Sequence, residues 1–367
     1  MTQPERARRY NFSAGPACLP LSVLEQAQQD LLCLPECGAS VMEISHRSAT
    51  FKGILASATS RLQRLLNIPD DYEVFFLQGG SRLQFSMVPM NLLGGQSGPG
   101  EYILGGSWGI KAYEEGQSSG KVHAAFDGKS IDYVRLPRSR ELSMSDDAAF
   151  LHFTSNETIH GTQYAEPPIV GQVPLVCDAS SDFLSRPLQV SDYGLIYACA
   201  QKNAGPAGVT VVIIRRDLLS RSADTLPGYL NYRLHVEQGS LYNTPPTFAI
   251  YIMDLILAWL EEKGGLSSLA EQNQEKANWL YTAIDASNGF YDGHADLDHR
   301  SLMNVTFRLP DDELRQKFLA GAAKRQMDSL AGHRSVGGIR ASIYNAMPPA
   351  GVECLAQFMD DFRKQST

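Results

Sequence analysis

A carboxylate and an amine in the middle of the chain have the types and spacing for cofactor chemistry. Asp178 ends the apolar run 174–178, and Lys202 ends the next apolar run, 195–202. Because open α/β sheets bind ligands at the carboxyl ends of their strands, we expect both side chains to face one site. Pyridoxal phosphate (PLP) needs a lysine that forms a Schiff base and a carboxylate that keeps the ring nitrogen protonated. Taken alone, Asp178 would be a helix cap and Lys202 a surface lysine, but together they predict a PLP enzyme.

A glycine turn earlier in the chain offers a place for the cofactor phosphate. The turn 79–82, Gly-Gly-Ser-Arg, follows the apolar run 73–77 and enters a predicted helix. Backbone N–H groups at a helix N-terminus bind anions. Trp108 follows the run 101–104 and can stack on an aromatic ring. The alternatives are an ordinary strand-to-helix turn and a core tryptophan.

Two His-Arg pairs supply positive charge for an anionic substrate. His46 and Arg47 lie near the N-terminus, and His333 and Arg334 open a glycine-rich stretch that reaches Arg340. Arginine binds both phosphate and carboxylate through its planar fork. The net charge of -8 gives the chain no general attraction for nucleic acid or an anionic membrane. An anionic ligand must therefore be held by a local cluster such as this one, the alternative being solvated surface charge.

The elements that position these residues alternate between apolar runs and polar or helical stretches, which is typical of an α/β fold. We expect strands of a largely parallel sheet at 73–77, 101–104, 149–153, 175–178, 195–198 and 209–214. A long helix is predicted to begin at Thr244, with threonine as its N-cap and two prolines in its first turn, and to end at the glycines 264–265.

The length and the pattern after this helix predict a second, smaller domain. A chain of 367 residues suits two domains. A second long helix is expected at 266–286, strands at 304–309 and 339–344, and a closing helix at 351–364. We predict an N-terminal segment at 1–15, a large cofactor-binding domain at 16–262 and a small C-terminal α+β domain at 263–367.

The six cysteines form no C-x-x-C pair and no zinc-type spacing, so no metal site is predicted. No apolar run approaches the roughly 18 residues that span a membrane. Residues 1–10 are polar, without the apolar region of a secretion signal. We expect free thiols in a reducing cytoplasm and no membrane partner.

Motifs spread from Tyr10 almost to the C-terminus give the chain a family resemblance. It resembles the phosphoserine aminotransferases, which are class V aminotransferases of PLP fold type I. The resemblance implies a large domain with a mainly parallel seven-stranded sheet and a smaller C-terminal α+β domain. The motifs are Asn-Phe-Ser-Ala-Gly-Pro-Ala from residue 11, Val-Met-Glu-Ile-Ser-His-Arg from 41, Asn-Glu-Thr from 156, Asp-Ala-Ser-Ser-Asp from 178, Ala-Gln-Lys-Asn-Ala-Gly-Pro-Ala-Gly from 200, Tyr-Asn-Thr-Pro-Pro-Thr-Phe from 242 and Gly-His-Arg-Ser-Val-Gly-Gly-Ile-Arg-Ala-Ser-Ile-Tyr-Asn-Ala from 332.

The resemblance implies a role for each cofactor-binding residue. Lys202 would hold the cofactor covalently, Asp178 would pair with its ring nitrogen, and Trp108 would stack on its ring. Thr158 would bond near the phenolic oxygen of the ring. Family members often have glycine at the position of Ser81, which here adds a hydroxyl donor. The residues implied to hold the cofactor phosphate are Ser81, Arg82 and Gln201, joined by Asn243 and Thr244 of the neighbouring subunit in a homodimer with shared active sites.

The same resemblance implies the substrates. Arg340 would bind the α-carboxylate of the substrate. The reaction would exchange an amino group between glutamate and 2-oxoglutarate on one side and O-phosphoserine and 3-phosphohydroxypyruvate on the other, in serine biosynthesis. Some relatives also act on 4-phosphohydroxythreonine in pyridoxine biosynthesis. The residues implied to bind the substrate's phosphate, or the distal carboxylate of glutamate, are His46, Arg47, His333 and Arg334.

Several alternatives stay open at the level of sequence. The chain could be another class V PLP enzyme, although the only cysteine after Lys202 is Cys354, in the predicted closing helix and poorly placed for a desulfurase. It could be a non-catalytic PLP-binding protein on the same fold. It could also be a nucleotide-binding α/β protein, which would leave Asp178, Lys202 and both His-Arg pairs without a purpose.

Overall fold

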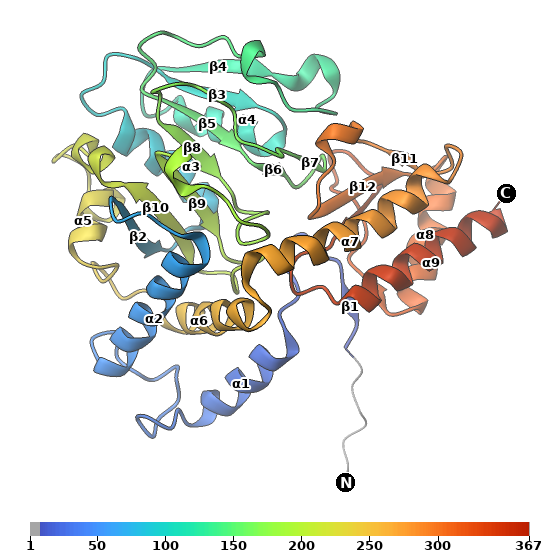
Figure 1. Cartoon of the computed structure of the whole chain (residues 1–367), viewed down its shortest axis with the longest axis horizontal. Coiled ribbons are helices and arrows are strands. Elements are labelled where there is room, and N and C mark those ends of the chain that lie inside the picture. Colours follow the sequence, from blue (N-terminus) through green and yellow to red (C-terminus); the bar gives the residue numbers. More distant parts are fainter. Residues whose placement is uncertain (1–7, 367) are drawn as a thin grey trace.

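A seven-stranded sheet forms the centre of the larger part of the molecule in this computed structural model, which describes residues 8–366 (Figure 1). The strand β10, next to the edge strand β2, runs antiparallel to both of its neighbours, whereas the remaining neighbouring pairs are parallel. The mainly parallel seven-stranded sheet is therefore confirmed. In spatial order the strands are β2 (Tyr72–Leu77), β10 (Thr210–Arg215), β9 (Leu195–Cys199), β8 (Leu175–Asp178), β5 (Phe150–Thr154), β3 (Gly100–Leu104) and β4 (Val122–Asp127).

Helices cover both faces of this sheet because alternate strand residues point to opposite faces. In β9, Ile196 and Ala198 belong to one core and Leu195 and Tyr197 to the other. The first core is shared with α1 (Leu21–Leu32), α2 (Ala49–Leu66) and α6 (Thr247–Glu262). The second core is shared with α3 (Gly80–Leu92), α4 (Ser107–Gly116) and α5 (Tyr232–Glu237).

The prediction that the long helix begins at Thr244 is wrong. The helix α6 begins at Thr247, its N-cap is Pro246, and no side chain caps it. A residue that precedes proline is pushed out of the helical region of backbone space. Because Pro245 and Pro246 are consecutive, both Thr244 and Pro245 precede a proline, and the helix starts only after them.

A smaller, three-stranded sheet lies beyond the second long helix, α7 (Gly265–Asp285). Its order is β11 (Asp292–Gly293), β12 (Asn304–Arg308) and β14 (Ile339–Ser342). A separate hydrophobic core joins it to α7, α8 (Asp312–Lys324) and α9 (Pro349–Ser366). The orange and red part of Figure 1 shows this arrangement. We propose that it forms the smaller domain, divided from the larger one near residue 263.

The start of the described chain belongs with this smaller part. The short strand β1 (Tyr10–Asn11) pairs in parallel with β13 (Met327–Asp328), and Phe12 is fully buried in the smaller core. Residues 1–7 of the predicted N-terminal segment lie outside the described residues. Within residues 8–366, no helix combines the length and apolarity needed to cross a membrane.

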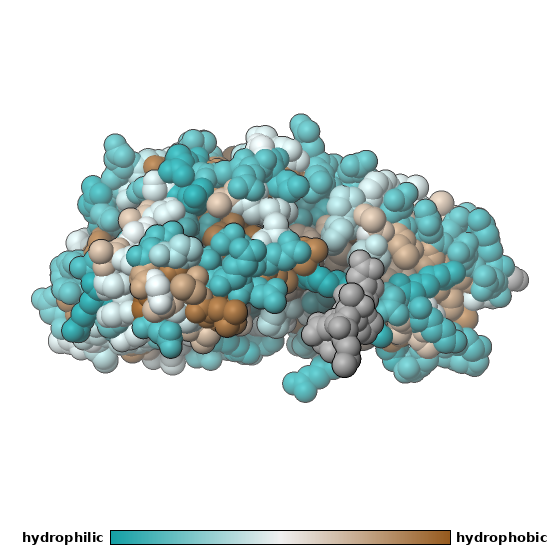
Figure 2. All heavy atoms as spheres, turned by 90° about the horizontal axis from the view of Figure 1, so that it is seen from below, coloured by the Kyte–Doolittle hydropathy of each residue, from teal (hydrophilic) through white to brown (hydrophobic). Residues whose placement is uncertain are grey.

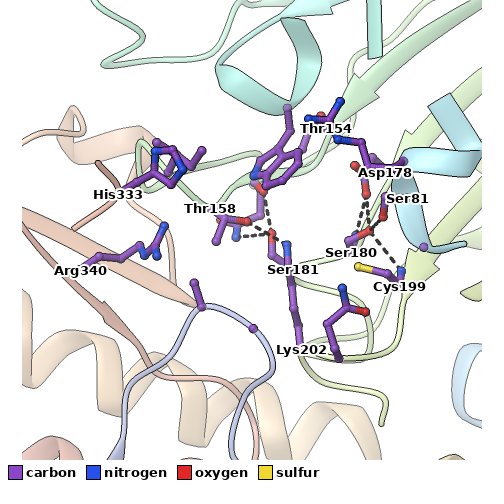
Figure 3. Close-up of a pocket in the computed structure, with 18 of the residues that line it drawn as sticks. Ser81, Thr154, Thr158, Asp178, Ser180, Ser181, Cys199, Lys202, His333 and Arg340 are labelled. Atoms are coloured by element: carbon purple, nitrogen blue, oxygen red, sulfur yellow. Dashed lines mark hydrogen bonds between the residues drawn. The ribbon is translucent and has the colours of Figure 1, made fainter. Parts of the chain in front are cut away.

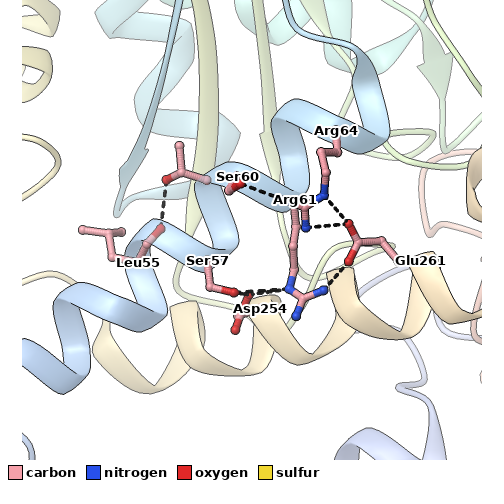
Figure 4. A network of polar contacts seen from close by, with 8 residues as sticks. Leu55, Ser57, Ser60, Arg61, Arg64, Asp254 and Glu261 are labelled. Carbon is pink, nitrogen blue, oxygen red and sulfur yellow. Dashed lines mark hydrogen bonds and ion pairs between the residues drawn. The ribbon is translucent and has the colours of Figure 1, made fainter.

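Helices α2 and α6 are held together by a network of charged and hydroxyl side chains (Figure 4). Arg61 donates to Asp254 at 3.1 Å and to Glu261, which also accepts a 2.8 Å bond from Arg64. Ser57 donates to Asp254 at 2.8 Å. Because residue numbers rise together along both helices in these contacts, the two helices run in the same direction and their N-termini lie at the same end.

Candidate active site

One cavity of about 350 Å³ lies at the carboxyl ends of the central strands and against the smaller sheet. Its lining comes from the turn before α3, the start of α4, the ends of β5 and β8, the segment after β9, and the smaller part of the molecule. Figure 3 shows Lys202 between two groups, with Asp178 and Ser81 on one side and His333 and Arg340 on the other. The predicted site residues that line this cavity are Ser81, Arg82, Trp108, Thr158, Asp178, Gln201, Lys202, His333 and Arg340.

Lys202 lies in a turn rather than at the end of a strand. The strand β9 ends at Cys199, and the backbone then turns, with the carbonyl of Ala200 accepting from the N–H groups of Ala204 and Gly205. The prediction that the strand reaches Lys202 is therefore wrong by three residues. The turn lets the side chain leave the sheet and enter the cavity.

The amine of Lys202 has two defined neighbours. Its Nζ donates to Thr158 Oγ1 at 3.0 Å and lies 5.7 Å from the centre of the Trp108 ring. Burial lowers the pKa of Lys202, but nearby acidic groups, among them Tyr344 and Asp178, outweigh this effect and leave the pKa above the ordinary lysine value. The raised pKa favours the cationic form of the amine, and Thr158 Oγ1 is the hydrogen-bond acceptor next to it.

Asp178 ends β8 as a buried carboxylate. Its Oδ1 accepts from the backbone N–H of Ser180 at 3.0 Å and from the Ser180 hydroxyl at 2.5 Å. Burial raises the pKa of Asp178, although the charge of Lys202 and the bonds from Ser180 pull it down. A carboxylate in such a place suits a partner that carries a proton or a positive charge.

Ser180, which sequence reasoning missed, links two predicted site residues. Its hydroxyl donates to Asp178, and it accepts from the Cys199 N–H at 3.2 Å. Its oxygen also lies 2.6 Å from Ser81 Oγ. Ser180 has one hydroxyl proton, which it donates to the Asp178 carboxylate. The Ser81 hydroxyl is therefore the donor in the contact between Ser81 and Ser180. The Asp-x-Ser spacing of residues 178–180 is the sequence signal that could have revealed this link.

The predicted phosphate cup is a helix N-terminus. Gly79 and Gly80 have φ values of +91° and +62°, which favour glycine, and α3 begins at Gly80. The first N–H groups of a helix lack intrahelical partners and point toward an anion placed there. Arg82 follows in the first turn, 4.0 Å from Glu115 and more than half exposed. The cup therefore offers backbone donors and one exposed cation.

Trp108 forms another wall of the cavity, in the first turn of α4. The Nζ of Lys111 lies 4.5 Å from the centre of its ring, and Phe85 lies 6.5 Å away, centre to centre. The fully buried Glu157, on the short strand β6 (Asn156–Glu157), accepts from the N–H groups of Trp108 at 3.0 Å and Gly109 at 2.8 Å. Burial raises the pKa of Glu157 to about 7.

The smaller sheet contributes the cationic side of the cavity. Arg340 lies on β14, where it pairs with Thr306 of β12, and burial lowers its pKa. The ring of His333 accepts from the N–H of Ser335 at 3.3 Å and lies 2.7 Å from its hydroxyl. Burial lowers the pKa of His333, and the neighbouring cation Arg340 lowers it further. The two side chains are placed to receive an anionic group.

A buried polar network connects this side of the cavity to the central sheet. Asn156 donates to Ser181 at 2.8 Å and to Asn304 at 2.7 Å. Asn304 in turn donates to Ser342 at 2.9 Å and to the Tyr344 hydroxyl at 3.2 Å. Asn156 is two residues from Thr158, and Ser342 is two residues from Arg340, so the network joins the surroundings of Lys202 to those of Arg340.

The lining fits pyridoxal phosphate. The cavity brings together an amine, a buried carboxylate, an aromatic wall and a helix N-terminus, which match the aldehyde, ring nitrogen, ring face and phosphate of that group. The buried Thr154 hydroxyl, also in the lining, has no hydrogen-bond partner among the described residues. Such an atom points to a polar ligand.

Five predicted residues do not line the cavity of their own chain. Arg334 follows His333 and is exposed. Asn243 donates to Gln78 at 3.2 Å, next to the phosphate cup. Arg47 and Thr244 are exposed, and His46 is partly exposed. His46 and Arg47 precede α2, and Asn243 and Thr244 precede α6, so these four residues lie at the same end of the parallel helix pair.

Comparison with known proteins agrees with this geometry. The family model described as aminotransferase class-V matches residues 9–355. The phosphoserine aminotransferase of Rhodopirellula baltica is 53% identical over 100% of this chain and 97% of its own length. That of Geobacillus kaustophilus is 54% identical over 98% of this chain and 99% of its own.

Solved structures give the same result. The phosphoserine aminotransferase from Bacillus circulans subsp. alkalophilus superposes with a TM-score of 0.95 at 48% identity, covering 98% of this chain and 99% of the other. The PLP-bound phosphoserine aminotransferase from Trichomonas vaginalis superposes with a TM-score of 0.92 at 40% identity, covering 96% of this chain and 100% of the other. These matches confirm the predicted fold class and the resemblance read from the motifs. The chain belongs to the class V aminotransferases and, within them, to the phosphoserine aminotransferase family.

Proposed function

We propose that this chain is a PLP-dependent transaminase that moves an amino group between glutamate and 3-phosphohydroxypyruvate. The observation that carries the proposal is the meeting of Lys202, Thr158 and Trp108 with the buried Asp178 in one cavity. The products are 2-oxoglutarate and O-phosphoserine, as in serine biosynthesis. The family membership and the full-length identity of about half to the named relatives support this choice.

In this proposal the cofactor supplies an electron sink for the pair of electrons left when the substrate loses its α-proton. Lys202 would hold the cofactor covalently through Nζ, and its free amine would act as general base toward the substrate α-proton and as general acid in returning it. Asp178 would pair with the ring nitrogen and favour its protonated form. Trp108 would cover one face of the ring and exclude water from it.

Substrate choice rests on the cationic groups. Arg340 binds the α-carboxylate, since a buried guanidinium makes a forked pair with a carboxylate. His333 and Arg334, together with His46 and Arg47, receive the phosphate of phosphoserine or the distal carboxylate of glutamate. Binding of the substrate's remote anionic group holds the α-carbon in place for the proton transfer. The binding energy of this group therefore speeds the reaction of phosphorylated substrates.

We propose that a homodimer completes the site. His46, Arg47, Asn243 and Thr244 share one end of the α2–α6 pair outside their own cavity, so they can enter the cavity of a second copy. Hydrophobic side chains gather on the face seen in Figure 2, on the side where α1 and α2 lie in Figure 1. A second copy would cover such side chains. The large exposed hydrophobic residues in or just after α1 are Leu21, Leu31, Leu32 and Met42.

Two finer points belong to the same proposal. The six cysteines, from Cys18 to Cys354, are unpaired, which suits a reducing compartment such as the cytoplasm. Activity on 4-phosphohydroxythreonine stays a prediction. It is expected because this substrate also carries the phosphate and the α-carboxylate that the site would bind. A direct assay with this amino acid as donor tests it.

The decisive experiment replaces Lys202 by alanine. Purified wild type should absorb in the visible range, lose this absorbance on adding glutamate, and produce O-phosphoserine from 3-phosphohydroxypyruvate. Lys202→Ala should lose the visible absorbance that depends on the Lys202 amine, and its turnover should fall by several orders of magnitude. Lys129→Ala, which removes an exposed lysine elsewhere, is the control and should behave as wild type. Normal transamination by Lys202→Ala would contradict the proposal, and equal activity on serine and phosphoserine would contradict the role of the cationic groups.

A further inference from the structure

Glu157 is a buried carboxylate that the proposed reaction does not use. It is 0% exposed, and its two oxygens accept from the first turn of α4, Oε2 from Trp108 and Oε1 from Gly109. The N-cap of that helix, Gly106, has no side chain with which to cap it. Glu157 therefore supplies, from a strand far away in sequence, the cap that α4 lacks.

The packing around the carboxylate is specific to it. A Cβ atom on the N-cap Gly106 would lie 2.5 Å from Glu157 Cδ, so glycine at this position lets the carboxylate fit directly against the backbone. A Cβ atom on Gly109 would lie in ordinary contact with Oε1, at 3.5 Å, and would instead meet the Ile103 carbonyl oxygen at 2.5 Å. No lysine or arginine forms an ion pair with Glu157 anywhere in residues 8–366. The backbone N–H groups and the helix dipole are what offset its desolvation.

We propose that Glu157 is a positioning residue that seats the Trp108 ring over the cofactor site by anchoring the first turn of α4. Trp108 is the second residue of the helix and donates directly to Glu157. Its ring lies within 5.7 Å of the Lys202 amine, so a shift of that turn moves the ring relative to the reacting groups. The stacking role of Trp108 rests on the proposed function, whereas the anchoring does not.

The same residue also connects the ring to the rest of the lining. Glu157 lies on β6 between Asn156, which joins the network to the smaller sheet, and Thr158, which accepts from Lys202. Three consecutive residues, 156–158, of which the first two form β6, therefore contact three parts of the site. Loss of the carboxylate removes two acceptors from the helix end while leaving Asn156 and Thr158 in place.

The test compares Glu157→Ala and Glu157→Gln in two measurements. In the cofactor-free chain with Trp259 and Trp279 replaced by phenylalanine, acrylamide quenching of Trp108 fluorescence should rise about twofold in Glu157→Ala. Titration with pyridoxal phosphate should then show binding weakened about tenfold, with a smaller visible circular dichroism band. Glu157→Gln should recover most of both signals, because its carbonyl still accepts one N–H and its shape is kept.

Asp311→Ala is the matched control, since Asp311 caps α8 by accepting from Leu314 at 2.7 Å, away from the cavity. It should lose thermal stability without changing quenching or cofactor affinity. A double-mutant cycle with Trp108→Ala decides the route. If Glu157→Ala weakens cofactor binding equally with and without the Trp108 ring, Glu157 does not act through that ring. Unchanged quenching in both Glu157 variants also overturns the anchoring, and this result is independent of whether pyridoxal phosphate binds at all.

Discussion

Ser180 shows how one hydroxyl can fix the direction of a catalytic carboxylate. It donates to Asp178 at 2.5 Å while receiving bonds from the Cys199 N–H and the Ser81 hydroxyl. All of its hydrogen-bonding capacity is thus used, and its orientation is determined. The chain of contacts couples the phosphate cup, through Ser81, to the group that would hold the ring nitrogen.

Ser180→Ala should therefore weaken cofactor binding about tenfold, roughly 1.4 kcal/mol, because a charge-assisted bond to Asp178 is lost. Ser185→Ala removes an equally buried hydroxyl that donates to the Asp182 carbonyl at 2.7 Å outside the cavity. Equilibrium titration with pyridoxal phosphate should find the Ser185 variant unchanged. Equal losses in the two variants would show that Ser180 acts on stability alone.

Glu157 gives the stability of the cofactor-free chain a defined pH dependence. Its pKa is raised from 4.5 to about 7, so its contribution is fully present below pH 4.5 and is lost as the pH rises through 7. Glu157→Gln cannot ionise. Its unfolding free energy relative to wild type should increase between pH 4.5 and 7 by on the order of 3 kcal/mol. Urea unfolding at both ends of this range measures the difference, and a difference independent of pH would contradict the raised pKa.

Residue types at the ends of apolar runs predicted Asp178, Lys202 and the glycine turn before α3, whereas Thr158 and Gln201 were predicted only from the family resemblance. The Asp-x-Ser spacing could have pointed to the contact of Ser180 with Asp178, but its contact with Ser81 and that of Glu157 with Trp108 join segments far apart in sequence. No local pattern records that a carboxylate on one strand caps a helix built from another segment. Ser180 and Glu157 both lie within the motifs that carry the family resemblance, but the resemblance implied no role for either residue.

At the scale of elements, the α2–α6 network joins the two helices whose N-terminal ends hold His46, Arg47, Asn243 and Thr244. Arg61 is its centre, since it contacts both Asp254 and Glu261. The Asp254 side chain is only 16% exposed and depends on Arg61 for its charged partner.

Arg61→Met should cost about 1–3 kcal/mol of folding stability, because it leaves the mostly buried Asp254 carboxylate without a cation. Arg315→Met breaks a pair within one helix, in which Asp312 is 74% exposed, and should cost less than about 0.5 kcal/mol. Thermal or denaturant unfolding of the holoenzyme would measure both. Equal costs would mean that the network contributes no more than an ordinary surface pair.

Apolar runs predicted six of the seven central strands to within about two residues at each end, because those strands are buried on both faces. They did not predict β4, which lies at the edge of the sheet with His123 and Ala124 exposed. The start of α6 was misplaced because the capping preference of Thr244 was weighed without the restraint that the following prolines put on the backbone. The first error came from the exposure of an edge strand, and the second came from two adjacent prolines that overrode a capping preference.

At the scale of the whole molecule, the fully buried Asn304 joins the smaller sheet to Asn156, next to the segment that holds Thr158. Asn304→Leu should cost about 2–4 kcal/mol, since Asn156, Ser342 and Tyr344 would each lose a partner in a buried place. Steady-state kinetics should show KM rising for both amino donors, because Arg340 moves with its strand. Asn278→Leu on the exposed face of α7 is the control. It should leave the unfolding free energy unchanged and should alter KM by no more than about twofold.

The network around Asn304 has a consequence for chemical selectivity. It fixes the strand of Arg340 relative to the segment that holds Thr158 and, through it, the Lys202 amine. Folding therefore sets the separation between the Arg340 guanidinium, which would receive a carboxylate, and the Lys202 amine, which would exchange with the substrate amine. An α-amino acid matches one such separation, whereas a β-amino acid, with its amine one carbon farther away, does not. A preference for α-amino acids would thus follow from the way in which this network joins the smaller sheet to residues 156–158.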